Sequence, residues 1–292
     1  MSTETKPLYI FGGDSFTWGE GLELYIESDY WIGQRKLRNH WNELSNKQTD
    51  ESKSFREQNR YPGLVASYFG GEPLVWPENG GGIDFGPIMI NKNIHLNPVA
   101  VINQFTAINR MNFHFSRFCK CKMCCNDYGS VRPLMFYVEC LRKKLTNEEF
   151  TEEDLFYLDY LEKVENIPLI PLTDGLQELL IDKVYTLFEP MFYRNLDIFI
   201  NEYLNNWIGK TKVLLIDSWD KKTSEYLNDH PIINQYLLPL KGWDGKYYKK
   251  WWEWESTFKH TRIYDEFPRT ENGHPTLLQH QYIAESIIEA LK

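Results

Sequence analysis

Four short apolar runs, spread over the whole chain, constrain the fold more than any other feature of this sequence. They are residues 8–11, 73–76, 99–105 and 212–217, which read LYIF, PLVW, VAVINQF and KVLLID. Their length and their β-branched residues indicate buried strands. Because long or helical segments separate the runs, the strands are expected to pair in parallel. We therefore predict an α/β fold with a mainly parallel sheet and helices on both faces.

The long middle of the chain contains no clear strand. Residues 152–164 and 174–208 carry helical periodicity instead. We interpret about 111–210 as a largely helical insertion in one domain that spans residues 1–292. The last helix is expected to begin at Thr276, which forms a capping box with Gln279.

Composition and charge exclude several classes of protein. The formal net charge of −9 argues against a dedicated nucleic-acid binder, because binding phosphates requires a basic surface. No apolar run approaches the length of a membrane span, and the N-terminus lacks the basic-then-apolar layout of a secretion signal. We therefore expect a cytoplasmic protein without a nucleic-acid or membrane partner.

Four of the 5 cysteines are clustered, at Cys119, Cys121, Cys124 and Cys125. Four thiolates are enough ligands for structural zinc, but such sites usually draw on two separated pairs, and two adjacent cysteines bind one ion with difficulty. The odd number of cysteines also argues against a secreted disulfide framework. We favour reduced thiols over a metal site and predict no cofactor.

The first apolar run ends in Gly12-Gly13-Asp14-Ser15. Ser15 is therefore expected just beyond the carboxyl end of a buried strand, where α/β proteins place their sites. A serine hydroxyl is a weak nucleophile that needs a neighbouring base and donors for the oxyanion that follows. Taken alone, a serine in this position is more typical of a helix cap.

A candidate base stands near the other end of the chain, in Glu271-Asn272-Gly273-His274-Pro275. A loop histidine followed by proline is held by the scaffold but can still reach a neighbour. Glu271, three residues earlier, can fix the tautomer of His274 and stabilise its cation. The alternative is a solvent-exposed loop histidine.

These two segments resemble the conserved blocks of a known family. GDSFTWGEG at 13–21 resembles the nucleophile block of the SGNH, or GDSL-type, hydrolases, and ENGHPTLLQHQYIAESI at 271–287 resembles their terminal block. The resemblance implies a flavodoxin-like three-layer α/β/α sandwich. It also implies that Ser15 is the nucleophile and His274 the base, without a cofactor.

Some positions depart from the family pattern. Glu271 stands where the family usually has Asp, and Asp265 is the fallback for that acid. His280 matches a second histidine of the family, which we interpret as structural because it lies on the helix beyond the loop.

The resemblance also implies an oxyanion hole. The family uses the N–H of the nucleophile, a glycine N–H and an asparagine side chain, which correspond here to Ser15, Gly82 and Asn109. The family's Gly-x-Asn-Asp pattern is not intact in residues 104–110. Arg110, where the family often has Asp, either binds an anionic group of the substrate or pairs on the surface.

Six aromatic residues lie close together in the segment 243–254. Such rings either stack on sugars or pack a long loop onto the domain, and we favour packing. If the segment is a binding surface, Trp251 and Asp217 are predicted to line the mouth of the site.

The sequence therefore predicts a serine esterase acting on a small-molecule or glycan ester, with O-acetylated carbohydrate as the favoured substrate. Two alternatives remain. The first is an O-acyltransferase on the same fold. The second is a weakly active or inactive structural or binding protein, of a kind that phages also encode and that can associate with the virion. Glu271 and the altered Gly-x-Asn-Asp pattern support the second alternative.

Overall fold

The structure is a computed structural model that describes residues 6–26, 49–77, 85–107, 143, 149, 193–259, 261–266 and 273–292. Most of the predicted insertion at 111–210 and the clustered cysteines lie outside these residues. Within 111–210, the chain is helical from residue 193 through η3 (Phe199–Leu204) to α10 (Asn205–Ile208). That 111–210 forms an insertion in one domain stays a prediction.

The predicted strands form one parallel sheet. They are β1 (Leu8–Gly13), β2 (Glu72–Pro77), β3 (Ala100–Gln104) and β4 (Lys212–Ile216), in the order β2-β1-β3-β4. This is the strand order of flavodoxin-like folds. A single parallel bridge between Leu215 and Leu237 extends the pairing beyond β4. The predicted α/β fold with a mainly parallel sheet is confirmed.

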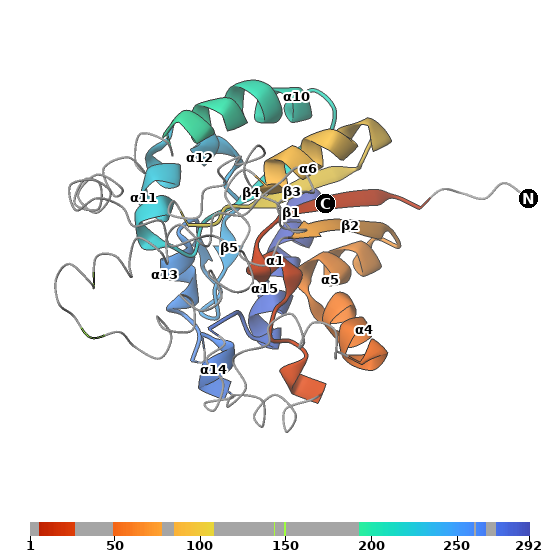
Figure 1. Cartoon of the computed structure of the whole chain (residues 1–292), viewed down its shortest axis with the longest axis vertical. Coiled ribbons are helices and arrows are strands. Elements are labelled where there is room, and N and C mark those ends of the chain that lie inside the picture. Colours follow the sequence, from red (N-terminus) through yellow and green to blue (C-terminus); the bar gives the residue numbers. More distant parts are fainter. Residues whose placement is uncertain are drawn as a thin grey trace, which may run out of the picture.

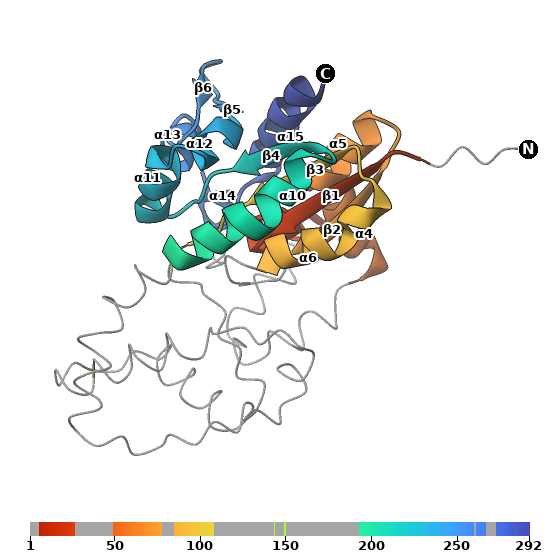
Figure 2. The same cartoon turned by 90° about the horizontal axis from the view of Figure 1, so that it is seen from above.

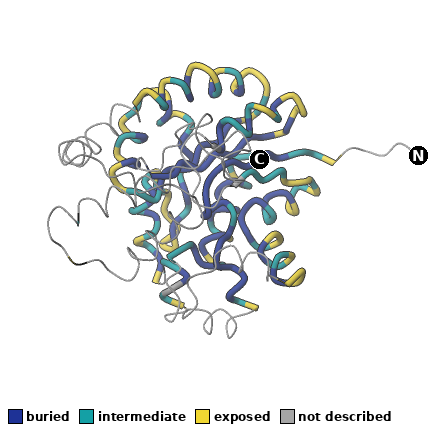
Figure 3. The backbone as a smooth tube through the Cα atoms, in the orientation of Figure 1, coloured by how far each residue is buried: buried dark blue, intermediate teal, exposed yellow. Residues whose placement is uncertain are grey.

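Helices cover both faces of the sheet (Figures 1 and 2). One face packs against α6 (Phe85–Asn93), η3, α10 and α12 (Ile233–Tyr236), and the other against α5 (Tyr61–Tyr68), α13 (Trp251–Glu255) and α15 (Leu277–Leu291). Alternate strand residues point to opposite faces, so Ile10 joins the first core and Phe11 the second. Figure 3 shows the buried strands inside and exposed residues along the outer sides of the helices.

The remaining elements have between two and ten residues. They are α1 (Ser15–Trp18), α4 (Asp50–Asn59), η2 (Ile94–Leu96), α11 (Lys221–Asp229), α14 (Ile263–Glu266) and the antiparallel pair β5 (Leu240–Lys241) and β6 (Tyr247–Tyr248). Among the described residues, no helix combines the length and the apolar character that crossing a lipid bilayer requires.

The aromatic segment 243–254 divides between packing and exposure. Trp251 and Trp254, both on α13, are completely buried in the core, as expected for packing. Trp243 and Tyr247 are more than half exposed on the β5–β6 hairpin. Packing therefore explains the two buried tryptophans of the segment but not Trp243 and Tyr247, whose rings lie at the surface.

Candidate active site

Asp14 fixes the turn that presents Ser15. It is the N-cap of α1 and accepts a hydrogen bond from the backbone N–H of Phe16 at 2.9 Å. Its other oxygen accepts from Thr106 Oγ1 at 2.8 Å and Trp219 Nε1 at 2.9 Å, residues that follow β3 and β4. The buried carboxylate thus joins the carboxyl ends of three neighbouring strands.

Two further polar contacts hold α1 through Thr17. Thr17 Oγ1 donates to Gln104 Oε1 at 2.9 Å and lies 2.6 Å from the hydroxyl of Tyr61. Because the only hydroxyl proton of Thr17 goes to Gln104, Tyr61 is the donor in the second contact. A Cβ on Gly13 would lie 2.0 Å from Thr17 Oγ1, so only glycine allows this close approach.

Ser15 and His274 meet above this edge of the sheet. His274 Nε2 lies 2.6 Å from Ser15 Oγ, although the two residues are 259 positions apart. Ser15 is buried, whereas 18% of the His274 side chain is exposed. The two groups predicted as nucleophile and base are therefore brought within hydrogen-bond distance, with the serine buried and the histidine partly exposed.

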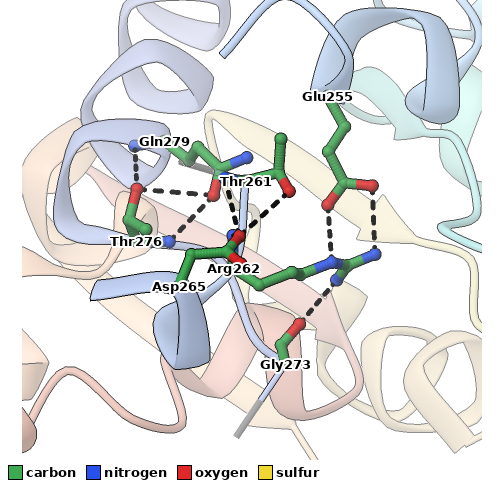
Figure 4. A network of polar contacts seen from close by, with 7 residues as sticks. All are labelled: Glu255, Thr261, Arg262, Asp265, Gly273, Thr276 and Gln279. Atoms are coloured by element: carbon green, nitrogen blue, oxygen red, sulfur yellow. Dashed lines mark hydrogen bonds and ion pairs between the residues drawn. The ribbon is translucent and has the colours of Figure 1, made fainter. Parts of the chain in front are cut away.

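The backbone of His274 is held on both sides. Arg262 donates to the carbonyl of Gly273 at 2.8 Å, and the N–H of Ile263 donates to the carbonyl of His274 at 2.6 Å. Glu255 binds the same guanidinium through two contacts, at 2.7 and 3.1 Å (Figure 4). These contacts orient the loop that carries the imidazole.

Figure 4 also shows two further anchors nearby. Thr276 caps α15 directly after the loop, and the predicted capping box with Gln279 is present. The Asp265 carboxylate, the fallback acid, accepts from the backbone N–H of Thr261 and Arg262. Asp265 therefore stabilises the start of α14 rather than the imidazole.

Glu20 is a site residue that sequence reasoning missed. Its Oε2 lies 3.4 Å from His274 Nε2, and 11% of the side chain is exposed. The signal was present in the GDSFTWGEG block, because Glu20 directly follows the glycine that ends α1.

Aromatic rings surround the pair. Phe16 stacks on Trp219 at 5.7 Å between ring centroids, meets Trp251 edge-on at 5.6 Å, and lies 5.1 Å from the His274 ring. Phe16 and Trp251 are buried, whereas Trp219 is partly exposed. In the described residues, Trp219 is thus the ring of this cluster that combines exposure with a position beside the nucleophile.

Two predicted substrate contacts have packing roles in the structure. Asp217 is buried and its carboxylate accepts from Ser224 Oγ and the N–H of Trp251, so it connects β4 to α11 and α13. Burial raises the pKa of Asp217 to about 6. Trp251 lies behind Phe16 and is fully buried. Contact of either residue with a substrate stays a prediction.

His280 lies in the core, as expected for a structural residue. Its Nδ1 accepts from the N–H of Tyr61 at 3.4 Å, and the two rings stack at 5.8 Å. Burial, and next the charge of Arg60, lower the pKa of His280 to about 3, so the ring is neutral at pH 7.

The remaining predicted site residues, Glu271, Gly82, Asn109 and Arg110, lie outside the described residues. The acid of the predicted triad and the predicted oxyanion donors, that of Ser15 included, therefore stay predictions. Within the described part of the chain, no cluster of three or more His, Cys, Asp or Glu could hold a metal ion.

Comparisons with known proteins add little to this geometry. Neither a protein-family model nor a curated protein sequence matches the chain. Among solved structures, the chain is similar to a carbohydrate esterase whose active site is described as displaying divergent catalytic and non-catalytic binding functions. The identity is 15%, the match covers 99% of this chain and 69% of that one, and the TM-score is 0.36.

Proposed function

We propose that this protein is a serine ester hydrolase of the SGNH type. The observation that carries the proposal is the 2.6 Å separation of Ser15 Oγ and His274 Nε2 at the carboxyl edge of a parallel sheet. A serine hydroxyl becomes an effective nucleophile when a neutral imidazole can take its proton, and this distance allows the transfer.

The reaction runs through an acyl-enzyme. Ser15 Oγ attacks the ester carbonyl while its proton passes to His274 Nε2, and the imidazolium then protonates the departing alcohol. Water, activated by the same imidazole, releases the acid. We assign the oxyanion to the N–H of Ser15, the N–H of Gly82 and the side chain of Asn109, and the contact to His274 Nδ1 to Glu271.

A carbohydrate ester is the substrate that we favour, with an acetyl group as the acyl part. Trp219 supports this assignment, because it is partly exposed and stacks on Phe16, the neighbour of the nucleophile. Its indole N–H is held by Asp14, so the orientation of the ring is fixed. Fixed aromatic faces bind the apolar faces of sugar rings well.

The first test uses p-nitrophenyl acetate and a fluorophosphonate probe. We expect turnover by the wild type, covalent labelling at Ser15 in a peptide digest, and a loss of about a thousand-fold or more in kcat for Ser15→Ala. The matched control is Ser54→Ala, which changes an exposed serine of α4 and should leave both readouts intact. Unchanged turnover in Ser15→Ala, or labelling elsewhere, rejects the proposal. Product analysis with a sugar acceptor present separates hydrolysis from acyl transfer.

A further inference from the structure

Two oxygens compete for one nitrogen in the site. Ser15 Oγ lies 2.6 Å and Glu20 Oε2 3.4 Å from the same atom, His274 Nε2. Ser15 can give its proton only to an Nε2 that carries a lone pair, whereas a carboxylate is attracted only to an Nε2 that carries a proton. The proton on this nitrogen therefore decides which contact is favourable: without it Nε2 can accept from Ser15, and with it Nε2 attracts Glu20.

The short helix that presents Ser15 also places Glu20. Gly19 ends α1 in the left-handed conformation, with φ of 78°, and the N–H of Glu20 donates to the carbonyl of Ser15 at 3.1 Å. A Cβ on Gly19 would lie 2.9 Å from Arg60 Cβ, so the chain can reverse here only with glycine. The carboxylate and the nucleophile are thus fixed by one turn of backbone.

The other described charged group near His274 is paired with a residue of opposite charge. The guanidinium of Arg262 binds the carbonyl of Gly273 but is paired with Glu255 through two contacts. Phe16 offers an uncharged ring from α1. Glu271 of the same loop lies outside the described residues. In the described part of the site, Glu20 is the charged side chain in contact with the reacting nitrogen.

We propose that Glu20 is a catalytic carboxylate that stabilises the imidazolium of His274 from the Nε2 side. The inference rests on the proposed hydrolase function. When Ser15 Oγ bonds to the ester carbon, its O–H bond breaks and an Nε2–H bond forms, so a positive charge appears 3.4 Å from Glu20 Oε2. This separation is long for a hydrogen bond, so the Nε2 proton remains available to the departing alkoxide, which takes it as the C–O bond breaks. Glu20 takes up no proton in this step, so its carboxylate remains negative throughout.

The test compares Glu20→Gln with a matched loss of charge at the opposite end of the sheet. Glu72 begins β2, pairs with Lys6 and is well exposed, so Glu72→Gln removes one negative charge far from the site. A nearby carboxylate favours the protonated imidazole, so its removal should move the acid limb of kcat/KM for p-nitrophenyl acetate to lower pH by about one unit. We expect the plateau kcat to fall about ten-fold, because one pH unit corresponds to a ten-fold change in equilibrium.

The control variant should reproduce the wild-type profile. Glu20→Asp, which keeps the charge, should retain most of the acid-limb position and also shows whether this turn tolerates substitution. A Glu20→Gln profile that overlays the wild type, or moves to higher pH, overturns the proposal.

A second readout does not depend on turnover. Imidazole NMR titration of His274 is recorded in Ser15→Ala and in Ser15→Ala/Glu20→Gln, and we expect the midpoint to be about one pH unit lower in the double variant. If the wild type shows no esterase activity, the hydrolase proposal fails, but this titration still decides whether Glu20 acts on the imidazole. Equal midpoints reject the charge contact even in an active enzyme.

Discussion

Arg262 connects the segment of the nucleophile with the loop of the base. Its guanidinium pairs with Glu255, donates to the carbonyl of Gly273 and lies 5.1 Å over the ring of Phe16. Phe16 follows Ser15 and Gly273 precedes His274, so one cation contacts the neighbours of both reacting residues. Burial raises the pKa of Glu255, and the charge of Arg262 opposes this rise. We interpret Arg262 as a positioning residue that acts through the His274 loop.

Replacing Arg262 by Ala should therefore lower kcat more than it changes KM. Losing the donor to Gly273 lets the loop shift, and a displacement of about 1 Å costs up to about a hundred-fold in rate, so we expect a ten- to hundred-fold fall in kcat. Added guanidinium chloride, at concentrations below those that unfold the protein, should restore part of the rate. The control is Lys241→Ala, which removes a partly exposed ion pair with Glu289 and should not change kcat. A full rate in Arg262→Ala would show that other contacts suffice.

Residues of the site differ in how far local sequence could predict them. Ser15 and His274 each follow a local signal, a strand that breaks into glycines and a loop that precedes a capped helix. Glu20 lies in the same block as Ser15, but its type alone does not show that it reaches His274 from the other end of the chain. Arg262 has no local signal, because its role depends on how its segment packs against the His274 loop. Charged residues beside glycine or on short helices are common at surfaces, so their types alone did not distinguish them.

At the scale of elements, strands and caps were predictable and several helices were not. Buried strands of a parallel sheet read as short apolar runs, which is why the four predicted runs match β1 to β4 within two residues. Helix α5 contains Pro62 and Gly63, which usually indicate a turn. The proline stands in the first turn, where it is tolerated, and Gly63 is required because a Cβ there would lie 2.0 Å from the carbonyl of Glu57. Packing against the core, rather than propensity, forms this helix.

The cap of α15 provides a prediction at this scale. Thr276 is buried, its hydroxyl accepts from the N–H of Gln279 at 3.3 Å, and the Gln279 side chain accepts from the N–H of Thr276 at 2.9 Å. Thr276→Ala removes the hydroxyl and should lower the free energy of unfolding by about 1 kcal/mol. Thr276→Ser keeps the acceptor and should lose less. Urea unfolding of the three proteins measures both values, and equal stabilities would mean that the cap contributes nothing.

At the scale of the whole molecule, two buried ionisable groups act on stability in opposite directions. Burial raises the pKa of Asp217 from 3.8 to about 6, so the folded state binds the proton of this carboxyl more tightly than the unfolded state. The resulting contribution to the free energy of unfolding is present below about pH 4 and is lost as pH rises to about 6. Burial lowers the pKa of His280 from 6.5 to about 3, so its contribution is present above about pH 6.5 and is lost as pH falls toward 3. Between about pH 4 and 6, Asp217 therefore makes the free energy of unfolding fall with rising pH, whereas His280 makes it rise.

Single substitutions should separate these slopes. In Asp217→Asn the carbonyl oxygen can still accept from Ser224 and Trp251, and the slope of Asp217 disappears. The free energy of unfolding should then rise more steeply with pH than in the wild type between about pH 4 and 6. The stability of the variant relative to the wild type should therefore increase toward neutral pH. In His280→Asn the side-chain oxygen can replace Nδ1 as the acceptor for Tyr61, and stability should fall relative to the wild type over the same interval. Urea unfolding at pH 4, 5, 6 and 7 measures both curves, with Asp229→Asn at the exposed end of α11 as the control for lost charge. Parallel curves for all four proteins would show that neither buried group changes its proton affinity when the sheet and its helices assemble.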